Sequence, residues 1–283
     1  MPPYPNLISD SLLISETIQL LELSGGRASA VDVVDYVMKI STPEPRIAKL
    51  LVSDLVEIDS RLRLIEDIVE LREDDLNSRN LGETDFVVFD LETTGAKIPP
   101  CRITEIGAYR IKNGAIEESF QTLVNPETPI PPFITQLTGI SNRMVRHAPK
   151  FREIGEEFLD FIGDSVLVAH NAPFDTNFLN HEISRVYPGH RMVNPHLCTV
   201  RLSRRVLPDI RNHRLDTIAD HFSIPIVSRH RAGSDALATA EIFLLLLTKL
   251  EEEHGVKDLV TARTFQFPEI KRTAPTLPLI PSL

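Results

Sequence analysis

One short apolar run in this chain ends in a pair of acidic residues, and this pair limits what the surrounding residues can form. In DFVVFDLETTGA, at residues 85–96, Phe86 to Phe89 have the composition of a buried strand, and Asp90 and Glu92 follow one residue apart. In an extended strand such side chains point to the same face, with Cα atoms roughly 6 to 7 Å apart. Two ionised carboxylates repel there by about 2 to 3 kcal/mol at an effective dielectric near ~20. The pair therefore indicates either a solvated strand end or a site that uses both acids.

Two further acids occur where helices are expected to begin. In VLVAHNAPFDTNFLNHEI a strand passes into a helix, with Pro173 suited to the first turn and Asp175 beside it. In SRHRAGSDALATAEIFLLLL we expect Ser234 to cap a helix with Asp235 in its first turn, and His230 comes five residues before Asp235. The helix dipole favours a carboxylate in a first turn. Each acid taken alone therefore also fits a structural role.

The order of elements after residue 85 predicts an α/β domain. Strands are expected at 86–92, 103–112 and 116–124, with a hairpin turn at Asn113-Gly114, and SVLVAH at 165–170 predicts another strand. Helices alternate with this later strand, which implies a mixed sheet with helices packed on it. The last helix is expected to bury Leu237, Ala240, Phe243, Leu244 and Leu247.

The first 72 residues predict a smaller unit of three short helices followed by a two-stranded hairpin. Its second helix is expected to bury Val34, Val37 and Met38, and its third helix to bury Ile47, Leu50 and Leu51. The order of these elements resembles a winged-helix module. Residues 1–80 carry 15 acids and 8 bases, so we expect this module to contact a protein partner or a second copy of the chain rather than DNA.

We accordingly divide the chain into four parts. Residues 1–75 form the winged-helix-like module, and the polar residues 76–84 form a linker. Residues 85–255 form the α/β domain, and residues 256–283 form a proline-rich C-terminal tail.

The composition fits a soluble protein, since 42% of the 283 residues are hydrophobic and 25% are charged. The longest apolar run, Ile242 to Leu247, is far shorter than the ~20 residues needed to span a bilayer. The N-terminus has no basic region followed by an apolar core. Cys101 and Cys198 form neither a metal-binding nor a disulfide pattern. These features predict a cytoplasmic protein with no membrane partner.

Charge is distributed unevenly along the chain. The net charge of -10 argues against a nucleic-acid partner, but residues 185–231 hold nine arginines and three acids. Arginine makes forked contacts to phosphate groups. This segment therefore fits either a phosphate-binding surface or a solvated basic face.

Together these motifs resemble the DnaQ-like, or DEDDh, family of 3'-5' exonucleases. The family includes the epsilon proofreading subunit of DNA polymerase III, ribonuclease T and oligoribonuclease. The resemblance covers residues 85–250 and rests on FDLETTG, ITEIGAYRI, LTGIS, HNAPFD, HRLDTIADHF and HRAGSDA, which occur in family order. It implies a ribonuclease-H-like mixed sheet flanked by helices and an enzyme that removes nucleoside 5'-monophosphates from the 3' end of DNA.

The resemblance also implies a catalytic set. Asp90, Glu92, Asp175 and Asp235 are expected to bind two divalent cations, Mg²⁺ or Mn²⁺, since hard ions prefer oxygen ligands. Asp90 is expected to bridge the two ions and Asp175 to hold the second ion. His230 is expected to take the proton from the attacking water. The tyrosine-bearing sister group has tyrosine four residues before the last aspartate, where this chain has Arg231.

Substrate contacts follow from the same resemblance. Leu91, Thr93, Thr94 and Gly95 are expected to line the pocket for the terminal nucleotide, with Asn171 and Phe174 as further candidates. Arg201 and Arg204, and with them Arg205 and Arg211, are candidate phosphate contacts. Asp216, in HRLDTIADHF, is expected to act as a fold or positioning residue.

Two other functions remain open on the sequence alone. A 3'-5' exoribonuclease or oligoribonuclease uses the same catalytic residues, because RNA and DNA are distinguished by contacts around the 2'-hydroxyl. A non-catalytic binding module, acting on nucleic acid or protein through the winged helix, is the second alternative. Proofreading within a polymerase and a stand-alone repair role are equally compatible with the motifs.

Overall fold

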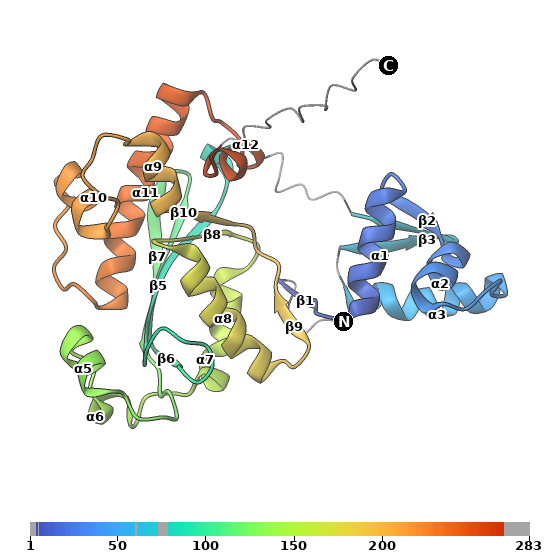
Figure 1. The fold of residues 1–283 in the computed structure, drawn as a ribbon, viewed down its shortest axis with the longest axis horizontal. Helices are drawn as coiled ribbons and strands as arrows, with labels where there is room; N and C mark the ends of the chain where they lie inside the picture. The colour runs from blue at the N-terminus through green and yellow to red at the C-terminus, as the bar shows by residue number, and fades with distance from the viewer. Residues whose placement is uncertain (1–3, 5, 60, 73–78, 269–283) are drawn as a thin grey trace, which may run out of the picture.

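A computed structural model describes residues 4, 6–59, 61–72 and 79–268 of the chain (Figure 1). Residues 76–78 of the expected linker and residues 269–283 of the expected tail lie outside the described residues. The elements fall into a five-stranded sheet with helices on both faces and a smaller unit of helices and short strands near the N-terminus.

The central sheet is mixed, as the sequence predicts. Its strand order is β10-β8-β5-β6-β7. The strands β5 (Phe86–Thr93), β6 (Ile103–Lys112) and β7 (Ala115–Leu123) are antiparallel neighbours. The strands β8 (Val166–Ala169) and β10 (His196–Cys198) run parallel to β5 on its other side. The turn between β6 and β7 has Asn113 and Gly114 at positive φ, as expected for a tight hairpin.

Alternation along β5 divides the core into two layers. Val87 and Phe89 belong to one cluster with α7 (Phe151–Ile162) and α8 (Ala172–Val186). Phe86 and Val88 belong to the other cluster, with α9 (Thr199–Val206), α10 (Leu215–Phe222) and α11 (Ala232–His254). Because successive side chains on a strand point to opposite faces, Asp90 and Glu92 continue the Phe86 and Val88 row on the α11 face.

The two short helices α5 (Pro132–Thr138) and α6 (Asn142–Val145) follow β7 and share a small apolar cluster of their own. Helix α12 (Leu259–Phe265) packs into the α11 layer through Leu259 and Ala262. None of the helices in the described ranges is both long enough and apolar enough to cross a membrane.

Segments outside the expected limits of the α/β domain pack into its core. Strand β1 (Leu7–Ser9) pairs with β9 (His190–Met192), and Leu7 is fully buried in the α7 and α8 layer. The 3-10 turn η1 (Leu81–Glu83) buries Leu81 against the α11 layer, next to a bridge between Asn80 and Asp258. The α/β domain therefore extends beyond the expected limits of residues 85 and 255. Strand β1, the turn η1 and helix α12 lie outside those limits, but their apolar side chains are buried in the core of the domain.

The N-terminal unit has its own apolar cluster. It consists of α1 (Leu12–Leu23), β2 (Arg27–Ser29), α2 (Ala30–Met38), α3 (Pro45–Ile58), β3 (Leu62–Ile65) and β4 (Ile68–Leu71). Its sheet order is β2-β4-β3. The three helices and the hairpin agree with the sequence analysis, whereas β2 is an additional strand.

Two expected apolar faces differ from the structure. Helix α3 buries Ala48, Val52 and Leu55, while Ile47 and Leu50 are 51% and 65% exposed. Helix α11 begins at Ala232, two residues before the expected cap Ser234, and Leu237 is 36% exposed. In both helices apolar residues occupy more than one face, so periodicity alone does not identify the buried one.

Candidate active site

The two acids of β5 lie at its C-terminal end, beside the strand that carries Glu105. Asp90 pairs in register with Gly107, and Glu92 pairs with Glu105, immediately before an irregularity between Glu92 and Thr93. The side chains of Asp90 and Glu92 are partly buried. The strand therefore holds two carboxylates side by side at the edge of the apolar core.

Asp175 reaches this place from the first turn of α8. The helix follows β8 after Asn171, which has a left-handed φ of 79°, and proline occupies its first turn. Asp175 is only 3% exposed, and its Oδ1 accepts a hydrogen bond of 3.2 Å from the backbone N–H of Leu91. This bond connects α8 directly to the strand between the two β5 acids.

Asp235 lies in the first turn of α11 and is also 3% exposed. Its Oδ2 accepts hydrogen bonds from the backbone N–H of His230, at 3.1 Å, and from Nη1 of Arg229. Its Oδ1 is buried and has no hydrogen-bond partner among the residues that the structure describes. His230 adopts a left-handed backbone with φ of 59°.

The start of α11 is fixed against β6 by Glu105 and Gly107. Oε2 of Glu105 accepts a 2.9 Å hydrogen bond from the backbone N–H of Ala232, and the same carboxylate pairs with the guanidinium of Arg231. A Cβ on Gly107 would lie 2.3 Å from the backbone carbon of Ala232. Only glycine at position 107 lets the backbone of Ala232 come this close to β6. This close contact between α11 and β6 brings Asp235 next to β5.

These elements enclose one pocket of about 200 Å³. It is lined by Asp90, Leu91, Glu92, His170, Phe174, Asp175, Leu215, Arg229, His230 and Asp235. The five predicted catalytic residues thus meet in one place, together with two of the predicted substrate contacts, Leu91 and Phe174. The other predicted contacts, Thr93, Thr94, Gly95, Asn171, Arg201 and Arg204, do not line it.

The loop after β5 is held by its own hydrogen bonds. Oγ1 of Thr93 donates to the carbonyl of Gly95 at 2.8 Å. Thr94 and Arg102 exchange two bonds, from the N–H of Thr94 to the carbonyl of Arg102 at 2.8 Å and from the N–H of Arg102 to Oγ1 of Thr94 at 3.0 Å. A Cβ on Gly95 would lie 2.8 Å from Sγ of Cys101. The loop therefore closes on itself beside the pocket.

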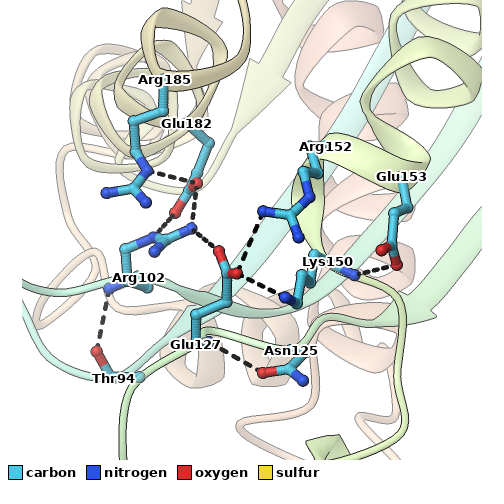
Figure 2. A network of polar contacts seen from close by, with 9 residues as sticks. All are labelled: Thr94, Arg102, Asn125, Glu127, Lys150, Arg152, Glu153, Glu182 and Arg185. Carbon is cyan, nitrogen blue, oxygen red and sulfur yellow. Dashed lines mark hydrogen bonds and ion pairs between the residues drawn. The ribbon is translucent and has the colours of Figure 1, made fainter.

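The Arg102 side chain connects this loop to α8 (Figure 2). Its guanidinium makes two hydrogen bonds to Glu182, of 2.5 and 2.9 Å, and a longer ion pair of 3.5 Å to Glu127. Glu127 also pairs with Lys150 at 2.9 Å and with Arg152 at 3.4 Å. Arg102 and Glu182 are 8% and 1% exposed. The loop at 94–102 and the helix that carries Asp175 are thus joined by a buried ion pair.

Two of the three predicted phosphate contacts on α9, Arg201 and Arg205, stack on aromatic rings. The guanidinium carbon of Arg201 lies 4.6 Å from the ring centre of Phe267, and that of Arg205 lies 5.1 Å from the ring centre of Phe265. Arg204 is exposed. Arg201 and Arg205 therefore stack on aromatic rings at the end of α12 and just beyond it.

Three pocket residues, His170, Leu215 and Arg229, were not among the predicted site residues. His170 begins the HNAPFD motif, and its Nδ1 lies 2.9 Å from Oγ1 of Thr199. Arg229 directly precedes His230, and Leu215 precedes Asp216. Their closeness in sequence to predicted residues is the only signal that marks them.

Burial and mutual repulsion make the pocket acids weak. Burial raises the pKa of Asp90 well above its ordinary value, and the charges of Asp175, Glu92 and Asp235 raise it further. Burial, followed by the charge of Asp235, raises the pKa of Glu92 to about 7. Burial likewise raises the pKa values of Asp175 and Asp235, although the nearby Arg229 opposes the change at Asp235. Burial and the charge of Arg229 lower the pKa of His170 to about 4, so this imidazole is neutral near pH 7.

The pocket has the donors that a divalent cation requires. Glu92, His230 and Asp235 each offer one ligand atom, and these atoms lie within 4.8 Å of one another. The unpartnered Oδ1 of Asp235 is a buried acceptor that a cation can satisfy. A cation would also relieve the repulsion among the carboxylates. The oxygen-rich donor set fits a hard ion such as Mg²⁺ or Mn²⁺.

Comparison with solved structures supports the fold. Exonuclease X in complex with 5' overhanging duplex DNA is similar with a TM-score of 0.51 and 24% identity, covering 64% of this chain and 99% of the other. E. coli exonuclease I in complex with single-stranded DNA has a TM-score of 0.54 and 16% identity, covering 61% of this chain and 42% of the other. At these identities the likeness concerns the arrangement of the elements.

Sequence comparison finds closer relatives. DNA polymerase III PolC-type of Caldanaerobacter subterraneus subsp. tengcongensis is 47% identical over 177 residues, which are 62% of this chain but 12% of that protein. DNA polymerase III subunit epsilon of Aquifex aeolicus is 38% identical over 187 residues, which are 66% of this chain and 92% of that protein. The chain thus spans about an eighth of the PolC-type relatives and nearly all of the epsilon subunit. Residues 87–243 match the family described as Exonuclease. The chain therefore belongs to this exonuclease family.

Proposed function

We propose that this protein is a metal-dependent 3'-5' exonuclease that removes nucleoside 5'-monophosphates from the 3' end of DNA. The observation that carries this proposal is the meeting of Asp90, Glu92, Asp175, His230 and Asp235 in one pocket. The relatives whose names refer to DNA polymerase III support DNA as the substrate. RNA is the alternative substrate that the experiment below tests.

The four carboxylates would hold two divalent cations, Mg²⁺ or Mn²⁺. When bound, such ions activate water and stabilise the charge of the leaving 3'-oxygen. Asp90 is close enough to Asp175 on α8 and to Glu92 on its own strand for both charges to raise its pKa, so it would be the carboxylate that the two ions share. The Leu91 N–H fixes the orientation of Asp175 through its 3.2 Å hydrogen bond. Asp235 offers Oδ1, while its Oδ2 is held by the His230 N–H and Arg229.

His230 would accept the proton of the attacking water. Its backbone is fixed by the hydrogen bond to Asp235, and one ring nitrogen lies within 4.8 Å of carboxylate oxygens of Glu92 and Asp235. We expect His230→Ala to lower kcat at pH 7 by about 10² to 10⁴-fold with little change in KM for the oligonucleotide, because general-base catalysis acts in the chemical step. Steady-state kinetics measure both constants. A large rise in KM with unchanged kcat would contradict this role.

The terminal nucleotide would lie against Leu91 and Phe174, with the backbone of Thr93, Thr94 and Gly95 at the side of the pocket. Asn171 stands at the start of α8, near Phe174. Arg204, exposed on α9, and Arg201 are candidates for contacts to phosphates farther along the strand. We expect their effects to be on KM rather than on kcat.

For the N-terminal unit we propose a winged-helix-like module at residues 11–72 that contacts a protein partner or a second copy of the chain. The order of three helices and a three-stranded sheet supports the resemblance. The apolar side chains Ile47 and Leu50 are exposed on α3. A surface that binds DNA would instead be rich in lysine and arginine side chains. For the α/β domain we propose limits that include β1 and α12. The two free cysteines fit a cytoplasmic location.

The decisive experiment uses a 5'-labelled single-stranded DNA oligonucleotide and its RNA counterpart, with Mg²⁺, with Mn²⁺ and with EDTA. Asp90→Ala is the matched inactive variant. A ladder that shortens from the 3' end, and that EDTA and the variant both abolish, supports the proposal. Faster degradation of RNA would reassign the substrate. No product from folded protein with either ion would contradict the enzymatic function and favour a binding module.

A further inference from the structure

Arg229 is a cation inside a pocket built from acids. Its Nε donates to Asp216 on α10 and its Nη1 donates to Asp235 on α11. The same side chain lines the pocket together with Asp90, Glu92 and Asp175. Its positive charge lowers the pKa of Asp90, Glu92 and Asp235, against the larger effect of burial. Arg229 therefore affects most of the pocket acids electrostatically.

The contacts of Arg229 leave part of its guanidinium available. A guanidinium has five N–H donors, and the two hydrogen bonds to Asp216 and Asp235 use only two of them. The side chain is 31% exposed. The remaining donors belong to a group that lines the pocket, so a ligand that enters it can reach them.

Other basic groups near the pocket are already committed or uncharged. The Arg231 guanidinium is occupied by Glu105 on β6. His170 is neutral near pH 7 because burial and Arg229 lower its pKa to about 4. Among the residues that line the pocket, Arg229 is the one with a permanent positive charge.

The two carboxylate oxygens of Asp235 have different environments. Oδ2 is taken by Arg229 and by the His230 N–H, whereas Oδ1 is buried without a partner. A cation bound at Oδ1 leaves the Arg229 contact at Oδ2 in place. Asp216, which does not line the pocket, holds the other side of the guanidinium. Arg229 can therefore remain fixed at the wall of the pocket while a ligand is bound.

We propose that Arg229 is a phosphate-binding residue of this pocket, which contacts a non-bridging oxygen of the terminal phosphodiester and then of the released nucleoside monophosphate. Asp216 is the positioning residue that orients its guanidinium. The inference rests on the proposed exonuclease function, because it assigns the group that the pocket binds. An arginine fork suits a phosphate oxygen, since both its charge and its paired donors match.

The test compares Arg229→Gln, Arg229→Lys and Asp216→Asn with the parent protein, each checked by thermal unfolding. Arg27→Gln removes an exposed arginine in the N-terminal unit and serves as the matched control. Isothermal titration measures binding of thymidine 5'-monophosphate at saturating Mn²⁺, and a separate titration measures binding of Mn²⁺. Steady-state degradation of single-stranded DNA gives KM and kcat.

We expect Arg229→Gln to weaken binding of thymidine 5'-monophosphate and to raise KM for DNA by about tenfold each, the effect of losing one charge-assisted contact. Binding of Mn²⁺ should change by less than about threefold, because Oδ1 of Asp235 is untouched. Arg229→Lys keeps the charge and should recover part of the loss. For both mononucleotide affinity and KM, Asp216→Asn should give values between those of the parent and those of Arg229→Gln. Arg27→Gln should give the same values as the parent.

Unchanged mononucleotide binding in Arg229→Gln overturns the inference, as does a parent protein that does not bind the mononucleotide. Tighter Mn²⁺ binding with unchanged mononucleotide binding would make Arg229 a counter-ion of the acids. If the parent binds the mononucleotide but degrades no DNA, and Arg229→Gln binds the mononucleotide more weakly, the proposed function fails and phosphate binding by Arg229 stands. If the parent degrades DNA and Arg229→Gln is identical to it, only the inference fails.

Discussion

Glu92 connects protonation of the pocket to folding of the whole domain. Burial and the charge of Asp235 raise its pKa from an ordinary 4.5 to about 7 in the folded protein. Between these values the folded chain binds a proton that the unfolded chain has released. The unfolding free energy from this group is therefore highest below pH 4.5 and is lost as the pH rises through 7. The carboxylates that make the pocket useful thus weaken the fold at neutral pH.

We accordingly expect Glu92→Gln to be more stable than the parent at pH 8 in EDTA, by about 1 to 2 kcal/mol. The difference should shrink as the pH falls toward 5, where Glu92 is already neutral. Urea unfolding at several pH values, with EDTA present, measures this. Saturating Mn²⁺ should reverse the order, because the parent then gains the free energy of binding the ion. A constant difference at every pH would contradict the linkage.

Residue patterns mark the acids and His230, which line the pocket, as candidate site residues but do not mark Arg229. The acids recur at strand ends and helix starts, places where a carboxylate has a recognisable physical reason. Arg229 is one of nine arginines in residues 185–231, and nothing in its spacing separates it from the others. Its role depends on Asp216 and Asp235, which the fold brings to it from two helices.

At the scale of elements, the position of α11 against β6 decides where Asp235 lies. The contact depends on Gly107, whose Cα faces the backbone of Ala232 without an intervening side chain. Glu105 then holds the first residues of the helix from the same strand. Sequence patterning predicts this helix start three residues later, at Asp235, because Ser234 is a good capping residue. The Oγ of Ser234 instead accepts a hydrogen bond from the N–H of Ser228. The tertiary contact to Glu105 overrides the local preference.

Gly107→Ala should therefore displace the start of α11. A Cβ at 2.3 Å from backbone atoms cannot be accommodated without a shift, so we expect a loss of about 1 to 3 kcal/mol in stability and a fall of about 10² in kcat. Gly82→Ala is the matched control, since its added Cβ has its nearest contact at 3.5 Å, from Oδ1 of Asn80. Chemical denaturation and oligonucleotide kinetics test both variants. Full activity in Gly107→Ala would show that α11 adjusts freely.

The Arg102 and Glu182 pair offers a second test of how elements are held. Glu182→Gln leaves the buried guanidinium of Arg102 without its principal carboxylate, so we expect a loss of about 3 kcal/mol in stability. The loop at 94–102 should loosen, with a rise in KM for DNA. The control is Glu118→Gln, because Glu118 is 61% exposed and pairs with Arg110 at the surface. This variant should lower the free energy of unfolding by less than about 1 kcal/mol. Equal effects of the two variants would contradict a special role for the buried pair.

Over the whole molecule, the mixed sheet and its helices were predictable, while the shortest segments were not. The strands β5 and β6, of eight and ten residues, are long runs rich in buried apolar residues, which the sequence shows clearly. Strand β1 has three residues, too few for any period to be recognised, and it pairs with β9 about 180 residues later in the chain. Its assignment to the α/β domain comes from burial of Leu7 in that domain's core.

Leu7→Ala should accordingly destabilise the α/β domain rather than the N-terminal unit. Removing a fully buried leucine side chain costs about 2 to 4 kcal/mol. Hydrogen exchange should show the loss of protection in β9 and α8, with α2 and α3 unchanged. Leu50→Ala, at a leucine that is 65% exposed, is the control and should change neither unit. Lost protection in α2 and α3 alone would place β1 in the other unit.

Because β1 belongs to the α/β domain, the chain leaves that domain after Ser9 and returns to it at Asn80. The N-terminal unit is therefore an insertion, anchored by two crossings of the chain instead of one. A single proteolytic cut inside the insertion leaves both ends attached to the same domain, so the cleaved protein should still elute as one species. A protein that binds the insertion would likewise be tethered to the α/β domain through both crossings, which would raise its local concentration at that domain.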